Sequence, residues 1–552
     1  MSQREIKNSK FAIRLPIIIA LTLVAGIFIG AKFFAQKTDY LDVIKSSGKF
    51  KEILTYIDRS YVDPVNTDSL ANYGIMKMLE KLDPHTAYLP AEEAEIAMSE
   101  LQNGFDGIGV EFNLFNDTVF VVSPLSGGPS EAAGIQTGDA IIEANGTNLT
   151  GDKVNTNLIF KTLRGERGST VKMKIKRPGN AKLLDFTVVR DKIPTFSVAA
   201  AYLMKDKQTG YLKITRFSDT TYKEFVENLQ KLKKQGMTRL ILDLRGNPGG
   251  YLERATSIAD EFIDGNGILV FTEGKDERNN QKLYARKTGI FEQNPLIVLI
   301  DEGSASASEI VSGALQDYDR ALLVGRRTFG KGLVQAPIAL SDGSELRLTV
   351  SRYYIPSGRS IQKPYVMGGD LEDYYSELLD RQSNGEFYTA DSIKNDDSKK
   401  YKTAHGRTVY GGGGVTPDVF VKRDTTYLTN YLIELFNKNV IREFTLQYVN
   451  AHKDELNRMG FDKYLTQFEV NSSMLNDIVK KGAASGITLN QKEFERSKPY
   501  IKNQVKAQIA RTIWKDENGL SNTYYQVINQ DDDAISIALN NFTKANALLK
   551  LK

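Results

Sequence analysis

The sequence predicts a multi-domain α/β protein with a helical N-terminal cap, a β-rich module, an α/β core and a helical C-terminal domain. A chain of 552 residues exceeds what one hydrophobic core organises, since a domain has roughly 150 residues. From residue 209, the strand-like "TGYLKITRFS", the helical "TYKEFVENLQKLKKQG" and the buried strand "RLILDLR" follow one another as in an α/β layer. Apolar residues three and four apart indicate helices near both ends.

Changes in the hydrophobic pattern predict the domain boundaries. Residues 38–103 have a helical pattern, as in "LANYGIMKMLEKLD", and form the predicted cap, whereas short strands and Gly-rich turns make residues 104–191 the β-rich module. The α/β core is expected at 192–424, and the helical C-terminal domain at 425–552. Within the core, the polar and charged insertion 366–406 is expected to be an exposed lobe.

Residues 1–37 are predicted to form a signal anchor. The segment "RLPIIIALTLVAGIFIGAKFF" has an apolar core of about 17 residues and follows several basic residues. No clear small-x-small cleavage site comes next, because Phe34 stands where a small residue is preferred. We therefore expect an uncleaved inner-membrane anchor rather than a removed signal peptide. In either case the rest of the chain is expected in the cell envelope, on the periplasmic side.

Composition disfavours several kinds of function. The net charge of +4 is too small to indicate a nucleic-acid partner. Cysteine is absent, which removes disulfides, thiolate metal sites and cysteine nucleophiles. The three histidines, His85, His405 and His452, are distant in sequence from the serine cluster described next, which disfavours a Ser-His-Asp triad although triads assemble in space.

The stretch "EGSASASEI" places three alternating serines between a buried strand, "NPLIVLID", and an amphipathic helix, "SEIVSGALQDY". One interpretation is capping, in which Ser304, Ser306 or Ser308 accepts a hydrogen bond from a backbone N–H at the helix start. The other is a nucleophile on a strand-to-helix turn, where backbone N–H groups and the helix dipole stabilise a developing oxyanion. Spacing alone leaves both interpretations open.

A nucleophile also needs a base, and "TFGKGLVQ" provides a candidate in Lys331 at the head of an apolar strand. As a base, its amine must be desolvated so that its pKa falls toward neutrality; otherwise it is a surface lysine in a turn. Gln335, on the same strand face, or Thr328 could orient the amine.

A Pro-Gly-Gly turn ends "LDLRGNPGG", and it is either only a turn or a source of N–H groups for an oxyanion hole.

Taken together, "LDLRGNPGGYL", "DEGSASASEIVSGALQDYDRALLVGRRTFGKGLVQ" and "SRYYIPSGRSIQ" closely resemble the C-terminal processing (tail-specific) serine peptidases. The resemblance spans roughly residues 41–421 and includes "LDPHTAYLP" in the cap and "GGGGVTPDV" near its end. It implies that the α/β core is a serine protease core and that the β-rich module is a PDZ domain.

The resemblance selects a dyad. In that family the base lies 25 positions after the middle serine, and 331 minus 306 gives 25, which implies Ser306 as nucleophile and Lys331 as base. Gln335 falls on the family's third catalytic residue. The implied reaction is acyl transfer, in which Lys331 takes the proton of Ser306 and returns it to the leaving amine, without a metal or cofactor.

The resemblance also implies supporting groups. The oxyanion hole would consist of the N–H of Ala307 and the N–H of either Gly249 or Gly250, and the sequence leaves the choice of glycine open. Asp317 matches a recurrent family position and is a candidate for a structural role, as any acid near a helix end can be. Arg164, in "TLRGERGS", is either a solvated loop arginine or a link between peptide binding and the core.

For the β-rich module, "GFDGIGVEF" and "GPSEAAGIQTGDAIIEANG" resemble a PDZ domain. The backbone N–H groups around Ile108, Gly109 and Val110 are expected to hold a terminal carboxylate, while the next strand takes the peptide as an added strand. The family implies protein or peptide substrates with apolar C-termini.

Three functions follow for comparison. The first is a serine endopeptidase with a Ser-Lys dyad that recognises C-terminal tails and trims or degrades proteins in the cell envelope. The second is a non-enzymatic adaptor that holds tails with its PDZ domain. The third is an assembly protein acting through homo-oligomerisation, supported only by the helical ends. Intact Ser306, Lys331 and Gln335 favour the enzyme. The insertion and the helical C-terminal domain could bind a regulator or form a dimer interface.

Overall fold

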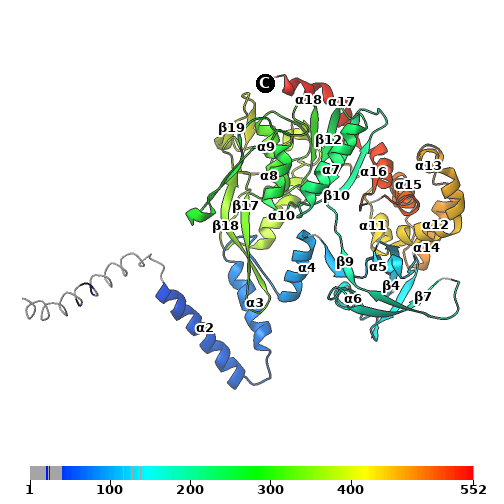
Figure 1. Ribbon diagram of the computed structural model, residues 1–552, viewed down its shortest axis with the longest axis horizontal. Coiled ribbons are helices and arrows are strands. Elements are labelled where there is room, and N and C mark those ends of the chain that lie inside the picture. Colours follow the sequence, from blue (N-terminus) through cyan, green and yellow to red (C-terminus); the bar gives the residue numbers. More distant parts are fainter. Residues whose placement is uncertain are drawn as a thin grey trace, which may run out of the picture. The chain divides into compact units, whose positions relative to one another are not determined.

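The computed structural model describes residues 40–550 except 103, 116, 126, 127, 137, 178 and 517, and also describes residues 20, 22 and 24. The predicted signal anchor thus lies almost entirely outside the described residues. Among the residues described, no helix combines the length and the apolar character needed to span a membrane. The chain forms two compact units, Met1–Met78 and Leu79–Lys552 (Figure 1).

The first unit contains helix α2 (Tyr40–Ser60) and most of helix α3 (Thr67–Leu79). In α2, Asp42 lies in the first turn and Arg59 in the last, where each charge complements the helix dipole. The boundary between the units falls inside the predicted helical cap. Helix α4 (Ala91–Leu101), which the sequence places in that cap, belongs to the second unit.

The β-rich module is an antiparallel sheet in the order β3-β4-β5-β7-β8, so β3 is an edge strand. Its strands are β3 (Val110–Phe115), β4 (Thr118–Pro124), β5 (Ala140–Ala144), β6 (Thr147–Asn148), β7 (Thr170–Lys176) and β8 (Leu184–Val189). In β7, buried Val171, Met173 and Ile175 alternate with exposed residues, as in a sheet with one solvated face. Helices α5 (Pro129–Ala132) and α6 (Thr156–Leu163) complete the module, and β2 (Phe105–Gly107) pairs with β9 (Asp191–Ile193).

The α/β core is built on a six-stranded sheet in the order β10-β11-β12-β15-β16-β21. The strands are β10 (Val198–Leu203), β11 (Thr209–Ile214), β12 (Arg239–Asp243), β15 (Leu296–Ile300), β16 (Leu322–Gly325) and β21 (Val419–Phe420). All pairs are parallel except β10 with β11. Every residue of β15 is buried, as expected for a parallel strand that is covered on both faces.

Helices cover both faces of this sheet. On one face lie α7 (Thr221–Lys234), α8 (Leu252–Asp260) and α9 (Ala307–Asp317), which pack against Leu242 and Val298. The opposite face, which carries Ile241 and Ile297, is covered by α17 (Asp533–Asn540) and α18 (Phe542–Leu549). The last two helices of the chain therefore pack against the α/β core, as Figure 1 shows at the C-terminus.

A second sheet of the core runs in the order β1-β18-β13-β14, with β17 also paired to β18. Its strands are β1 (Ala87–Leu89), β13 (Ile268–Gly274), β14 (Lys282–Tyr284), β17 (Leu333–Ala339) and β18 (Glu345–Tyr354). β17 begins two residues after Lys331, so this sheet carries the predicted base, whereas the parallel sheet carries the serine cluster at the end of β15.

The insertion 366–406 contains helix α10 (Leu371–Ser383) and strand β19 (Lys400–Lys402), which forms a hairpin with β20 (Thr408–Tyr410) directly after the insertion. Most residues of α10 are exposed, but Tyr374 and Arg381 are buried. Arg381 Nη1 donates to Thr328 O (3.0 Å) and its Nη2 donates to Arg327 O (2.7 Å). The helix therefore packs on the loop that leads to Lys331.

Most of the remaining helices form a second hydrophobic core of their own. They are α11 (Asn430–Asn437), α12 (Val440–Met459), α13 (Phe461–Gln467), α14 (Ser472–Ala484), α15 (Gln491–Ile513) and α16 (Asn522–Ile528). This bundle contacts the edge strand of the β-rich module through Glu111, which pairs with Arg442 at 2.7 Å and with Arg511 at 3.1 Å.

Candidate active site

The serine cluster lies on a tight turn between β15 and α9, and two of its three hydroxyls are used to hold the turn. Ser304 Oγ donates to Leu244 O (2.8 Å), and Ser308 Oγ donates to Asn247 O (2.9 Å). Both acceptors belong to the neighbouring turn after β12. Ser304 and Ser308 therefore tie the two turns together and leave Ser306 as the serine that faces a cavity.

Ser306 has a strained backbone, with φ of +53° and ψ of −112°. Residues other than glycine rarely adopt a positive φ, and such strain is concentrated at functional sites. Its N–H donates to Glu309 Oε2 at 2.8 Å. The Ser306 side chain and Glu309 form a capping box at the start of α9, and within the described part of the chain Ser306 Oγ donates no hydrogen bond that would occupy its proton.

Lys331 lines the same cavity as Ser306 and is half-buried. Its Nζ donates to Gln335 Oε1 at 2.9 Å, so Gln335 does contact the amine, as expected from its place on the strand. Burial, assisted by the positive charge of Arg347, lowers the pKa of Lys331 below its usual 10.5. A larger fraction of the amine is therefore neutral near neutral pH than for an exposed lysine.

Ser306, Lys331 and Gln335 line one cavity of about 650 Å³. Its walls are largely apolar, with Met98, Leu101, Leu252, Ile310, Leu333 and Val334 among them. Glu345 and Arg347 pair at one part of the wall, with 2.7 Å between Oε1 and Nε. No hydrogen bond joins Ser306 Oγ to Lys331 Nζ in the described structure, although both face the same space.

Two buried residues that the sequence analysis missed connect the serine turn to the lysine loop. The Glu309 carboxylate accepts four hydrogen bonds: from the N–H groups of Ser306, Gly330 and Lys331 and from the Thr328 hydroxyl, at 2.5–2.9 Å. Burial raises the pKa of Glu309 to about 7. The Tyr353 hydroxyl lies 3.1 Å from Ser306 O and 2.6 Å from Lys331 O.

A local signal for Glu309 was present in the sequence. A serine followed three positions later by glutamate, at the start of a helix, is the pattern of a capping box, and "SASE" has it. Tyr353 comes from β18, and no short-range pattern indicated it. Thr328 supports the site through Glu309 rather than by contacting the lysine amine.

The Pro-Gly-Gly turn approaches the serine turn closely. Gly249 has φ of +102°, and a Cβ atom there would lie 2.8 Å from Ser306 Cβ and 2.9 Å from Ala307 N, so only glycine fits. The Gly249 N–H already donates to Asn247 Oδ1 at 2.9 Å. Gly250, by contrast, lines the cavity beside Ser306. This favours Gly250 as the glycine partner of Ala307 in an oxyanion hole.

Asp317 is buried away from the dyad. Its Oδ1 lies 2.9 Å from Arg359 Nη2, both side chains being 1% exposed, and its Oδ2 accepts from Ser357 N at 2.9 Å. Burial raises the pKa of Asp317. The residue joins the end of α9 to the loop after β18, which agrees with a structural role.

Two carbonyl groups of the loop of Ile108, Gly109 and Val110 accept hydrogen bonds from within the β-rich module. Ile108 O accepts from Ser130 N (3.0 Å) and Gly109 O accepts from Leu125 N (2.9 Å). Because trans peptide units point N–H and C=O in opposite directions, the N–H groups of Gly109 and Val110 face away from these donors. They adjoin the free edge of β3, where an added strand can pair.

Arg164 is not a solvated loop residue. Its guanidinium lies over the rings of Phe105 and Phe160, with 4.2 and 4.4 Å to the ring centroids. Arg164 Nη1 also donates to Ser99 Oγ in α4 at 3.3 Å. Since Met98 and Leu101 of α4 line the catalytic cavity, Arg164 connects the β-rich module to the wall of that cavity.

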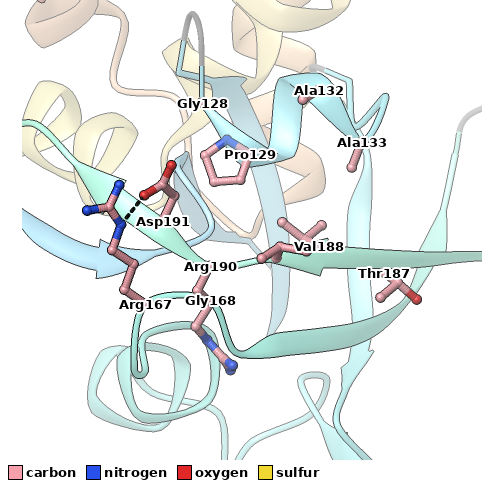
Figure 2. A pocket seen from close by; sticks show the side chains of 11 residues that line it. Gly128, Pro129, Ala132, Ala133, Arg167, Gly168, Thr187, Val188, Arg190 and Asp191 are labelled. Atoms are coloured by element: carbon pink, nitrogen blue, oxygen red, sulfur yellow. Dashed lines mark hydrogen bonds and ion pairs between the residues drawn. The ribbon is translucent and has the colours of Figure 1, made fainter.

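Another cavity, of about 580 Å³, lies in the β-rich module between α5 and the end of β8 (Figure 2). Its charged groups have partners within the module: Arg167 pairs with Asp191 at 2.6 Å, and Arg190 donates to Leu163 O at 3.0 Å. It contains no part of the Ser306 site, and we assign it no chemistry.

Comparisons with known proteins identify the family and two of the domains. The model of peptidase family S41 matches residues 208–369, the PDZ domain model matches 107–188, and a family of unknown function matches 431–516. The carboxy-terminal-processing protease of Bartonella bacilliformis is 35% identical over 348 residues, which cover 61% of this chain and 79% of that protein.

Another relative and a solved structure are also similar to this chain. The carboxy-terminal processing protease CtpB of Bacillus subtilis is 34% identical over 321 residues, which cover 58% of this chain and 66% of that protein. Among solved structures, the photosystem II D1 C-terminal processing protease is 27% identical, with a TM-score of 0.34; the match covers 68% of this chain and 93% of that one.

Proposed function

Because this chain belongs to the carboxy-terminal processing proteases of peptidase family S41, and is therefore a serine-type peptidase with a PDZ domain, we propose that Ser306 and Lys331 are its catalytic dyad. The observation that carries the proposal is the shared cavity, which both the strained Ser306 and the half-buried Lys331 line. Nucleophilic catalysis by a serine requires its hydroxyl and a base that takes the hydroxyl proton.

In the proposed reaction, Ser306 Oγ attacks the scissile carbonyl carbon while neutral Lys331 takes the hydroxyl proton. The N–H groups of Ala307 and Gly250 stabilise the oxyanion. Lys331 then gives its proton to the leaving amine, and the acyl-enzyme forms. Water, deprotonated by Lys331, hydrolyses this ester and regenerates Ser306. Gln335 keeps the amine in place through the 2.9 Å hydrogen bond.

We further propose that the PDZ domain selects substrates by their C-terminal tail. The N–H groups of Gly109 and Val110 would bind the terminal carboxylate, with Ile108 buried behind them, and the tail would pair with β3. Arg164 would transmit this binding to α4 and so to the catalytic cavity. The apolar walls of that cavity suit apolar residues of the substrate.

The proposed location is the cell envelope, with residues 1–37 as an inner-membrane anchor. The support for this is the apolar, positively flanked N-terminal segment of the sequence. Helix α2 exposes Val43, Ile44, Phe50 and Ile53, which offers a surface for homo-oligomerisation or for a regulatory adaptor. The domain boundaries 38–103, 104–191, 192–424 and 425–552 are retained as part of this proposal.

The test is cleavage of an unfolded protein that ends in an apolar tail, compared with the same protein carrying an amidated C-terminus. With the full-length peptidase, kcat/KM for the amidated substrate should be about tenfold lower, because a charge-assisted carboxylate contact is lost. Mass spectrometry of the products gives both rates. Equal cleavage of the two substrates would contradict tail recognition, and tail binding without cleavage would favour the adaptor.

The dyad predicts that activity rises with pH. Lys331 must be neutral to accept the proton, and the Glu309 carboxyl, with a pKa of about 7, must be ionised for both of its oxygens to accept their four hydrogen bonds. Protonation of either group lowers the activity of the enzyme as pH falls. We therefore expect kcat/KM to increase between about pH 6 and pH 9. A profile that declines across this interval would be inconsistent with a lysine base.

A further inference from the structure

Helix α10 of the insertion places Tyr374 beside the loop of the proposed base. Tyr374 is 7% exposed, and its hydroxyl lies 3.0 Å from His85 Nε2 and 3.2 Å from Gln362 Nε2. We propose that Tyr374 is a positioning residue that holds Lys331 in its catalytic orientation. This inference depends on Lys331 being the base.

The first connection runs through the side chain of the base. His85 O accepts a hydrogen bond from Gln335 Nε2, and Gln335 Oε1 in turn accepts from Lys331 Nζ. The Gln335 amide is thereby fixed in one orientation, because its nitrogen faces the His85 carbonyl and only its oxygen can face the ammonium. Tyr374 anchors the ring of the same histidine, and the two rings pack edge to face with centroids 5.2 Å apart.

The second connection runs through the backbone of the lysine loop. Gln362 Oε1 accepts from Gly332 N at 2.8 Å, directly after Lys331, and Gln362 Nε2 donates to Lys363 O at 2.8 Å. The remaining hydrogen of that amide nitrogen points to the Tyr374 hydroxyl oxygen. One hydroxyl therefore restrains both the side chain of Lys331, through His85, and its backbone, through Gln362.

These contacts also define the direction of the hydrogen bonds. Since Gln362 Nε2 has no lone pair to offer, the Tyr374 oxygen accepts from it, and the Tyr374 O–H is free to donate to His85 Nε2. Burial lowers the pKa of His85 to about 4, so the ring is neutral at neutral pH. A neutral ring with an acceptor at Nε2 has its proton on Nδ1.

Further contacts keep Tyr374 itself in place. Lys363 Nζ donates to Tyr374 O at 2.9 Å and to Glu377 Oε2 at 3.0 Å, and it lies over the rings of Tyr374 and Phe329. On the other side, Asp83 accepts from the N–H of His85 at 2.9 Å and shapes the turn that presents the His85 carbonyl. The insertion is thus part of the support of the base.

The test is Tyr374→Phe in the full-length protein, with Tyr375→Phe as matched control. Tyr375 is the next residue of α10, is half exposed, and its hydroxyl makes only a 3.4 Å contact with Pro84 O. We expect kcat for the tailed substrate to fall about tenfold in Tyr374→Phe with KM unchanged, because a small displacement of a catalytic group slows chemistry without weakening binding. Tyr375→Phe should match the wild type.

A mutant cycle with Gln335→Ala separates positioning from general stability. If Tyr374 acts through Gln335, Tyr374→Phe should lower kcat much less in the Gln335→Ala background than in the wild type. The same cycle with Gln362→Ala tests the second connection, and equal losses in the wild-type, Gln335→Ala and Gln362→Ala backgrounds would overturn the proposal. Should Tyr374→Phe fail to fold, His85→Leu removes the same hydrogen bond from the other side and must reproduce the loss of kcat.

The outcomes separate this inference from the dyad itself. If Lys331→Ala abolishes cleavage while folded Tyr374→Phe has the kcat of the wild type, the positioning role is wrong and the dyad stands. If Lys331→Ala retains cleavage, the dyad is wrong and the positioning role fails with it. Loss of kcat in Tyr374→Phe, together with an inactive Lys331→Ala, supports both.

Discussion

Ser306→Ala and Lys331→Ala should each lower kcat for tail-directed cleavage by at least about 10⁴-fold, the size of loss seen when a nucleophile or its base is removed. Ser306 Oγ donates to no described residue and the Lys331 amine donates to Gln335, so truncation removes chemistry more than packing. Because both residues act in one proton transfer, the double variant should be no slower than either single variant.

Mass spectrometry of the cleavage products measures this loss, and thermal unfolding shows whether each variant is folded. Ser312→Ala is the matched control, since Ser312 lies on the same helix and donates only within it, to Ser308 O at 2.8 Å and to Glu309 O at 3.5 Å. Undiminished cleavage by folded Ser306→Ala or Lys331→Ala would disprove the dyad.

Glu309→Gln is expected to have the next largest effect. The carboxylate accepts four hydrogen bonds, whereas the amide has one acceptor oxygen and an NH₂ group that would face other donors. The serine turn and the lysine loop then lose their common acceptor. We expect kcat/KM to fall by about 10² to 10³, and the free energy of unfolding by about 2 to 4 kcal/mol.

Enzyme assays and denaturant titrations measure the two effects. Glu302→Gln is the control, because Glu302 lies in the same turn but pairs with Arg326 at 2.7 Å instead of holding the dyad. A Glu309→Gln variant with wild-type activity would show that the shared carboxylate does not organise the site.

The pH dependence of stability provides a second readout for Glu309. Its pKa is about 7 in the folded protein and 4.5 for an unperturbed glutamate, so the folded state binds more protons between these values. The raised pKa of Glu309 therefore stabilises the folded protein fully below about pH 4.5. This contribution to the free energy of unfolding is lost as pH rises from 4.5 to 7. Glu309→Gln should remove this part of the pH dependence.

The comparisons and the structure confirm the predicted fold class and the peptidase family. Both depend on local patterns: a fully apolar "LIVLI" predicts a buried parallel strand, and alternation in "TVKMKIK" predicts a half-exposed one. The serine cluster at a strand-to-helix turn and the lysine at the start of a strand are local as well. Their catalytic roles, and the carboxylate-binding role of Gly109, stay predictions.

The sequence was less informative wherever a contact between residues distant in the sequence determines the structure. It left Gly249 and Gly250 equivalent, since only the fold shows that the Gly249 N–H is already bonded to Asn247. It suggested an exposed insertion because α10 is rich in charged residues, whereas Tyr374 and Arg381 are buried against the lysine loop. A largely exposed helix can still bury individual polar side chains when their polar groups find partners.

From short motifs and their resemblance to the C-terminal processing peptidases, this chain could be recognised as a serine peptidase with a PDZ domain, because strand-to-helix turns and Gly-rich loops are encoded within about ten residues. The surroundings of the base depend on tertiary structure. His85 and Tyr374 are 289 positions apart and His85 and Gln335 are 250 apart, yet hydrogen bonds connect these three residues to Lys331. Packing of distant segments creates such hydrogen bonds and the desolvation that lowers the pKa of Lys331, and neither has a local signature.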